Sequence, residues 1–99
     1  MEKYNLIIYP KVYLDLDNIY SNIIAESFSL NQAIRKTNRI WQGILSLNEF
    51  PESHQERFWG RYSKKGYRQL IVDNYIVIFK VDKDVKTVNV VAVQHHGQE

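Results

Sequence analysis

Cysteine is absent from the 99-residue chain, and glycine and proline are scarce, with four and two copies. The lack of cysteine excludes disulfide bonds and thiolate metal sites and is compatible with a reducing compartment. The glycines are scattered, so no glycine-rich loop could surround the phosphates of a nucleotide cofactor. No apolar run approaches the roughly 18 residues of a membrane span, and the N-terminus lacks the pattern of a signal peptide. We therefore expect a soluble cytoplasmic protein with no cofactor and no membrane partner.

Hydrophobic residues make up 44% of the sequence and aromatic residues 13%. A chain of this length can build one compact core but not two, so we expect a single domain over residues 1–99. The formal net charge of +2 is too small to indicate nucleic acid as a partner by itself. The positions of the basic residues are therefore more informative than their number.

A strand and two helices are expected in the first half of the chain. The apolar run at residues 4–9 predicts a strand that ends before Pro10. Apolar residues then recur every three or four positions, which predicts an amphipathic helix to about Ser27. A capping box that starts at Ser29 begins a second helix, which ends before Pro51. The two helices should form a hairpin.

β-branched and aromatic residues dominate the chain after a polar loop at residues 52–56. They predict strands separated by short polar connections suited to hairpins, at residues 57–63, 67–72, 75–81 and 86–95. The expected fold class is α+β, with a helical hairpin packed on a small antiparallel sheet in the order β-α-α-β-β-β-β.

This element order, together with the sequence of residues 66–96, resembles the toxins of the RelE/ParE superfamily. The pieces that carry the resemblance are Leu47 with Phe50-Pro51, Tyr67-Arg68 with Leu70, Tyr75 with Ile78-Phe79, and His95 at the end of the last strand. The resemblance implies the toxin of a type II toxin–antitoxin system, held inactive by an acidic and partly disordered antitoxin. It also implies a target, which is either mRNA on the ribosome or DNA gyrase, and the fold does not choose between them.

Arg68 and His95 match positions that carry catalytic side chains in the mRNA-cleaving branch. Metal-independent RNA cleavage needs a base, an acid and cations that neutralise the phosphate. We expect Arg68 to bind phosphate oxygens and Arg61 to assist it; the alternative for Arg68 is a structural ion pair with a helix carboxylate. These residues would make the protein an endoribonuclease, or mRNA interferase.

His95 can exchange a proton near neutral pH, which acid–base catalysis requires. The apolar set Val88, Val90 and Ala92 is expected to face the helices, so alternation along the strand should turn His95 to the open face. The alternative is an exposed terminal histidine without a role. His96 should point the other way, and no third ligand is evident, so we expect no metal site.

Basic and aromatic residues alternate between residues 57 and 68. If residues 57–63 form a strand, one face would carry a basic surface that could bind an RNA backbone and stack a base. The residues assigned to RNA binding are Arg57, Trp59, Lys64 and Lys65. The alternative is an edge strand that positive charge protects from aggregation.

The second helix has a basic flank made by Arg35, Lys36 and Arg39. For a toxin that poisons gyrase without chemistry of its own, this flank and the rest of the hairpin would form the partner surface. Its simpler meaning is a solvated helix face.

Two departures from the mRNA-cleaving pattern bear on the choice of target. Ile76 stands where many members have an Arg after the aromatic residue, and Gly97 stands near the end where many continue with an Arg. Loss of a charge that stabilises the transition state is usually costly. Ile76 therefore favours the gyrase-directed branch, although histidine-dependent nucleases tolerate the same loss. Ribosome-dependent mRNA cleavage remains the leading prediction, with non-enzymatic gyrase poisoning as the alternative.

Overall fold

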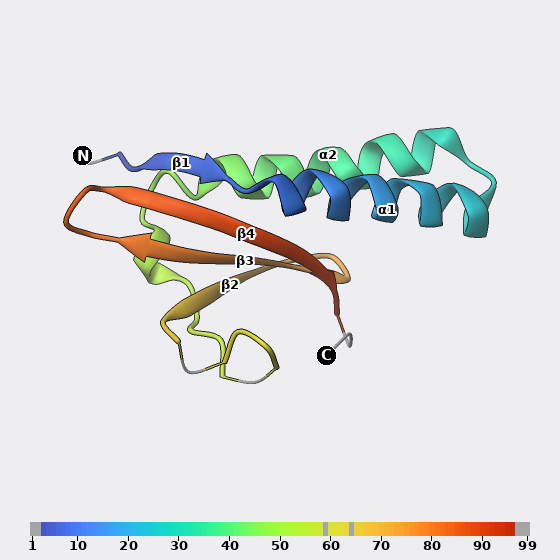
Figure 1. Cartoon of the computed structure of the whole chain (residues 1–99). Helices are drawn as coiled ribbons and strands as arrows, with labels where there is room; N and C mark the ends of the chain where they lie inside the picture. The colour runs from blue at the N-terminus through green and yellow to red at the C-terminus, as the bar shows by residue number, and fades with distance from the viewer. Residues whose placement is uncertain (1–2, 59, 64, 97–99) are drawn as a thin grey trace.

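The computed structural model describes residues 3–58, 60–63 and 65–96. A four-stranded sheet with the order β1-β4-β3-β2 is covered on one side by two helices (Figure 1). The elements in chain order are β1 (Asn5–Ile8), α1 (Pro10–Ser27), α2 (Leu30–Ser46), a short 3-10 turn η1 (Pro51–Ser53), β2 (Tyr67–Val72), β3 (Tyr75–Asp82) and β4 (Thr87–His95). No helix in the described part of the chain is long and apolar enough to cross a membrane.

Helix α1 begins at Pro10, where the fixed φ of proline suits a first helical turn and no backbone donor is lost. Its buried residues are Val12, Leu16, Ile19 and Ile23, the three- and four-residue spacing predicted from the sequence. The helix ends at Phe28, whose backbone N–H donates to the carbonyl oxygen of Ile24 at 2.8 Å.

Helix α2 follows after a single further residue. The Ser29 hydroxyl accepts a hydrogen bond from the backbone N–H of Gln32 at 3.2 Å, which confirms the predicted N-cap. Its buried side chains are Ala33, Thr37, Ile40 and Ile44. The predicted helical hairpin is therefore confirmed.

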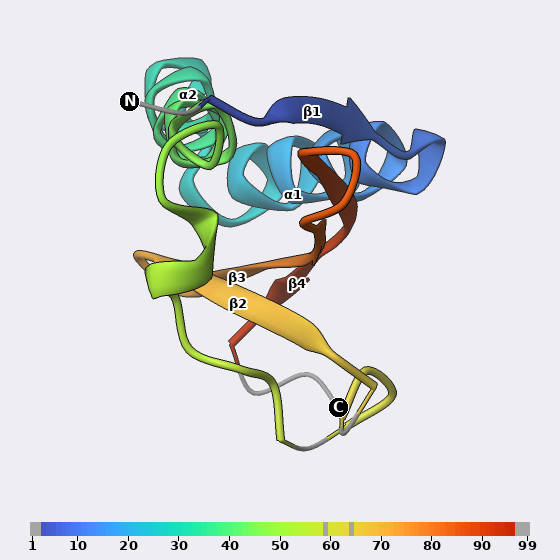
Figure 2. The ribbon, with the colours of Figure 1, turned by 90° about the vertical axis from the view of Figure 1, so that its left-hand side faces the viewer.

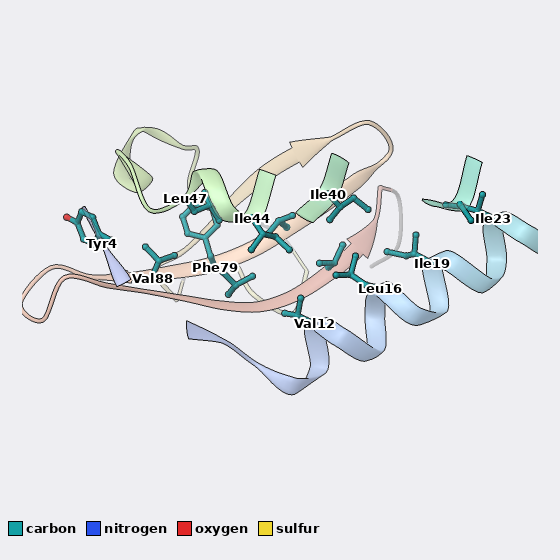
Figure 3. Packing of buried hydrophobic residues seen from close by; sticks show 14 residues of the cluster. Tyr4, Val12, Leu16, Ile19, Ile23, Ile40, Ile44, Leu47, Phe79 and Val88 are labelled. Carbon is teal, nitrogen blue, oxygen red and sulfur yellow. The ribbon is translucent and has the colours of Figure 1, made fainter. Parts of the chain in front are cut away.

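The main core lies between the hairpin and the sheet (Figure 3). The two helical stripes pack on sheet residues that point to the same side, namely Val77, Phe79, Val88, Val90 and Val93. Burial of each larger aliphatic side chain contributes about 1.5–3 kcal/mol. This layer holds the hairpin in a fixed position on the sheet.

A β-bulge divides β4 and changes which side chains share a face. Phe79 pairs with Val90 but Ile78 pairs with Ala92, so Val91 is the extra residue. The register on the C-terminal side of the bulge is shifted by one, and Ala92 joins Ile76 and Ile78 in a second apolar cluster on the face away from the helices. The prediction that Ala92 packs against the helices is therefore wrong.

The helical hairpin on a small sheet confirms the predicted fold class, while two details differ. Strand β1 pairs parallel with β4, so the sheet is mixed and not wholly antiparallel. The segment predicted as a strand at residues 57–63 contains a turn in its described part, where the Ser63 N–H donates to the carbonyl oxygen of Gly60 at 3.2 Å. Gly60 has φ 81°, which a regular strand cannot accommodate. The chain after η1 first pairs with the edge of β2 through a bridge between Glu56 and Arg68, and then continues on the side away from the helices (Figure 2).

Candidate functional site

Arg68 lies on the helix-covered side of β2, because it pairs with Phe79 of the main core. Its Nη1 donates a hydrogen bond to the carbonyl oxygen of His54 at 2.7 Å. The His54 ring packs edge-on against Phe79, with 5.8 Å between ring centroids. Burial, and secondarily the charge of Arg68, lower the pKa of His54. Arg68 therefore ties the chain after η1 to the sheet.

His95 also lies on the helix-covered side, contrary to the prediction that it faces the open side. The bulge at Val91 is the physical reason, because it moves Val93 and His95 to the face that the helices cover. The His95 ring packs edge-on against Tyr75 at 5.5 Å between ring centroids. Burial, followed by the charges of Glu26 and Asp73, raises the pKa of Tyr75.

His95 and Tyr75 line a groove of about 500 Å³ where the hairpin extends past the sheet. The other residues that line it include Asp15, Asn22, Glu26 and Lys36. Asp15 accepts a hydrogen bond from the backbone N–H of Val93 through Oδ2, at 2.9 Å. This bond closes the edge of β4 where β1 has ended.

The structure does not bring Arg68 and His95 together. Arg68 lies opposite Phe79 on β2, whereas His95 lies opposite Tyr75 on β4. Four residues along β3 and two strand spacings therefore separate their Cα atoms, which amounts to about 16 Å. The Arg68 guanidinium is bound to the carbonyl of His54, whereas the His95 ring packs against Tyr75, so the two groups are held by different parts of the structure.

Arg57 is buried, with 1% of its surface exposed. Its Nη1 donates to Oε1 of Gln69 at 2.8 Å, its backbone N–H donates to the carbonyl oxygen of Tyr67 at 2.7 Å, and burial lowers the pKa of its guanidinium. The prediction that Arg57 lines an exposed RNA-binding face is therefore wrong. Arg61 and Lys65 are exposed, and Trp59 and Lys64 lie outside the described residues.

The face of the sheet away from the helices is largely apolar at its centre. Ile76 is 3% exposed and packs with Ile78, Val91 and Ala92, and the partly buried rings of Tyr62 and Tyr67 lie against them. An isoleucine at this position thus replaces the arginine of the mRNA-cleaving pattern with a packed side chain. At the border of this cluster, Nζ of Lys80 lies 5.1 Å from the centroid of the Tyr67 ring, four residues along β3 from Ile76.

The basic flank of α2 is exposed, as predicted, but its three members differ. Arg39 forms two hydrogen bonds with the carboxylate of Asp73, at 2.8 and 3.0 Å. This pairing raises the pKa of Arg39 and lowers that of Asp73. Arg35 and Lys36 form no ion pair with any residue in the described ranges. They are thus the members of this flank that could bind a partner.

An apolar surface at the tip of the hairpin was not predicted from the sequence. Phe28, Leu30 and Ile34 are 91%, 56% and 43% exposed. Phe28 also has a positive φ of 52°. A signal was present in the sequence, because only Phe28 separates the predicted end of one helix from the N-cap of the next. The tip joins exposed apolar side chains to the exposed cations Arg35 and Lys36, which form no ion pair within the described part of the chain.

Comparisons with known proteins agree with this architecture. The model of a family described as the ParE toxin of the type II toxin–antitoxin system parDE matches residues 6–99. The chain is similar to a solved structure of the chromosomal ParDE system from P. aeruginosa, with TM-score 0.77, 18% identity, and coverage of 94% of this chain and 96% of that one. A RelBE toxin–antitoxin complex from Mycobacterium tuberculosis has TM-score 0.63, 15% identity, and coverage of 94% and 98%. A search among curated proteins finds no match.

At these identities the two solved structures show a shared fold, a helical hairpin on a small sheet that is found in toxins of the RelE/ParE superfamily. This confirms the resemblance drawn from the sequence. The family match extends over almost the whole chain, and the protein belongs to the ParE toxin family of type II toxin–antitoxin systems.

Proposed function

We propose that the protein arrests growth by binding DNA gyrase, without cleaving RNA itself. The observation that carries this proposal is the separation of Arg68 and His95: by strand geometry their Cα atoms lie about 16 Å apart, and the Arg68 side chain is bound to the carbonyl of His54. A ribonuclease needs its acid, base and phosphate-binding cation around one bond. The family match to ParE toxins supports the same choice.

The apolar face around Ile76 is the second support for a toxin without ribonuclease chemistry. Residues that stabilise a transition state must direct charge toward the reacting phosphate. Here Ile76 and Ile78 are buried in an apolar cluster. The exposed hairpin surface, with the cations Arg35 and Lys36, is the better candidate for contact with a protein target.

The expected setting is the bacterial cytoplasm, where gyrase and a cognate antitoxin would both be present. The two solved structures described above come from toxin–antitoxin systems, which supports an antitoxin as partner. A positively charged toxin surface suits an acidic antitoxin segment that becomes ordered on binding.

Expression of the chain in a bacterial host tests the proposal, beside the double variant Arg68→Ala with His95→Ala. We expect both proteins to arrest growth and to induce the DNA-damage response, while mRNA ends mapped in both cultures match those of uninduced cells. New mRNA ends that appear with the wild type and vanish with a folded double variant would contradict the proposal and favour ribosome-dependent cleavage. Circular dichroism of the purified variant checks that it is folded, because Arg68 also holds the chain after η1.

A further inference from the structure

Phe28 occupies a backbone conformation that disfavours it. Its φ and ψ are 52° and 30°, in the left-handed region where glycine is the usual residue at the end of a helix. A side chain with a Cβ costs roughly 1–2 kcal/mol there relative to the right-handed region. The position therefore carries a conformational cost that glycine would avoid.

The turn at the tip is held by groups that do not involve the Phe28 ring. The backbone N–H of Phe28 donates to the carbonyl oxygen of Ile24 at 2.8 Å, and the Ser27 hydroxyl donates to that of Ile23 at 2.6 Å. The N–H of Ser29 donates to the same Ser27 hydroxyl at 3.2 Å. The ring itself is 91% exposed, so it adds little to the core. Phe50 shares the left-handed backbone and an exposed ring, so what distinguishes Phe28 is that its ring lies on a tip that also exposes Leu30 and Ile34, and such a patch indicates contact with another molecule.

The surroundings of Phe28 indicate the chemistry of that molecule. Leu30 and Ile34 extend the apolar surface along α2, at 56% and 43% exposure. Every charged residue of α2 is basic, and Arg35 and Lys36 form no ion pair with the described residues. The complementary surface is an apolar pocket bordered by carboxylates, which is a protein surface and not the phosphate backbone of a nucleic acid.

The position of the tip makes such docking possible. Helices α1 and α2 extend beyond the end of the sheet, so their connection projects from the body of the molecule (Figure 1). A pocket on a partner could therefore enclose Phe28 without meeting β2, β3 or β4.

We propose that Phe28 is the anchor by which the hairpin tip docks into an acidic-rimmed apolar pocket of gyrase. This inference rests on the proposed function and assigns its contact surface. Phe28 fills the pocket, Leu30 and Ile34 widen the apolar contact, and Arg35 and Lys36 meet carboxylates at its border.

Two matched glycine variants test the anchor. Phe50 is also in the left-handed region, with φ 50°, and is 64% exposed, but it follows the other end of α2. Phe28→Gly and Phe50→Gly should therefore both keep a melting temperature at least equal to that of the wild type. Only Phe28→Gly should weaken the interaction, because an anchoring aromatic side chain typically contributes a factor of roughly 30 or more in affinity.

The measurement is the toxin concentration that gives half-maximal trapping of cleaved plasmid DNA by purified gyrase. The inference predicts an increase of at least about 30-fold for Phe28→Gly and less than about threefold for Phe50→Gly. Equal trapping by wild type and Phe28→Gly would overturn the docking inference alone. A wild type that traps no DNA would overturn the proposed function and this inference with it. An equal loss in both variants would also overturn the inference, since the tip would then have no special role.

Discussion

Arg57 lies in the most basic segment of the sequence, yet its side chain is among the most deeply buried of the protein. Its partner is Gln69 on β2, whose Oε1 accepts a hydrogen bond from Nη1 at 2.8 Å. A buried guanidinium depends on hydrogen bonds to buried polar groups. Removal of one partner leaves the other unsatisfied, which lowers the free energy of unfolding. The residue therefore fixes the chain before β2 against the sheet and does not present charge to a ligand.

Arg57→Ala should destabilise the protein by about 2 kcal/mol or more, because it leaves the buried side-chain oxygen Oε1 of Gln69 without its donor and opens a cavity. Urea denaturation followed by circular dichroism measures this change. Arg61→Ala, an exposed arginine in the same segment, is the control and should change stability by less than about 0.5 kcal/mol. Equal stability of both variants would show that Arg57 is not a structural residue.

His54 gives a pH dependence whose direction follows from its surroundings. Its pKa in the folded protein is below its ordinary value of 6.5, chiefly because burial disfavours the imidazolium. The unfolded chain therefore binds a proton more readily as the pH falls below about 6.5. The stability contributed by neutral His54 is fully present above that pH and is lost as the pH falls toward the folded pKa.

We expect the free energy of unfolding to fall between pH 7 and pH 5, and His54→Gln to reduce this slope. The variant keeps the backbone carbonyl that accepts from Arg68. Urea unfolding at several pH values measures both slopes, and identical slopes would contradict the assignment to His54.

At the scale of elements, Gly43 shows how closely α2 approaches β2. A Cβ at this position would lie 2.9 Å from Cγ2 of Val72 and 3.2 Å from Cδ2 of Leu70. A larger residue would therefore push the helix off the sheet. We predict that Gly43→Leu destabilises the protein by about 1–3 kcal/mol despite the better helix propensity of leucine. A thermal melt checks this, and an unchanged or raised melting temperature would show that the contact is loose.

Asp15 joins α1 to β4 through the backbone N–H of Val93, at 2.9 Å. Asp15→Ala should cost about 1–2 kcal/mol, because that partly buried donor would lose its acceptor. Asp15→Asn retains an acceptor oxygen and should lose less than half as much. Amide hydrogen exchange at Val93 reports the bond directly, and it should become faster in the alanine variant than in the asparagine variant. Equal exchange in the two variants would mean that Asp15 does not hold this edge.

Local patterns predicted the helices and hairpins because those elements depend on neighbouring residues. The spacing of Val12 and Leu16, and the cap at Ser29, were sufficient for the helical hairpin. The bulge at Val91 could not be predicted, because alternation along one strand does not reveal an extra residue opposite its partner. For this reason alone, the sequence predicted the wrong side of the sheet for His95.

The parallel pairing of β1 with β4 and the burial of Arg57 depend on contacts between distant parts of the chain. Sequence spacing carries no direct signal for either. The candidate site was predicted less well than the fold, because its residues were assigned from the resemblance to a superfamily that contains two mechanisms. The exposure of Arg35 and Lys36 was predicted correctly, because helical periodicity places them outside the apolar stripe of α2.

At the scale of the whole molecule, the exposed surface suits binding better than catalysis. The side of the sheet away from the helices has an apolar centre around Ile76. On the helix-covered side, Arg68 lies opposite the middle of β3, whereas His95 lies opposite the first residue of β3. The projecting hairpin combines exposed apolar side chains with exposed positive charge, which is the composition of a protein-binding surface. Charge on this surface should also speed association with an acidic target, so binding should weaken as salt rises.

The most direct test of the account is incubation of the purified chain with purified gyrase, supercoiled plasmid and ATP, followed by denaturation and electrophoresis. We predict that the wild type converts plasmid into protein-linked cleaved DNA. A folded double variant, Arg68→Ala with His95→Ala, should do so equally. No cleaved DNA from gyrase, together with cleavage of ribosome-bound mRNA that the double variant abolishes, would contradict it.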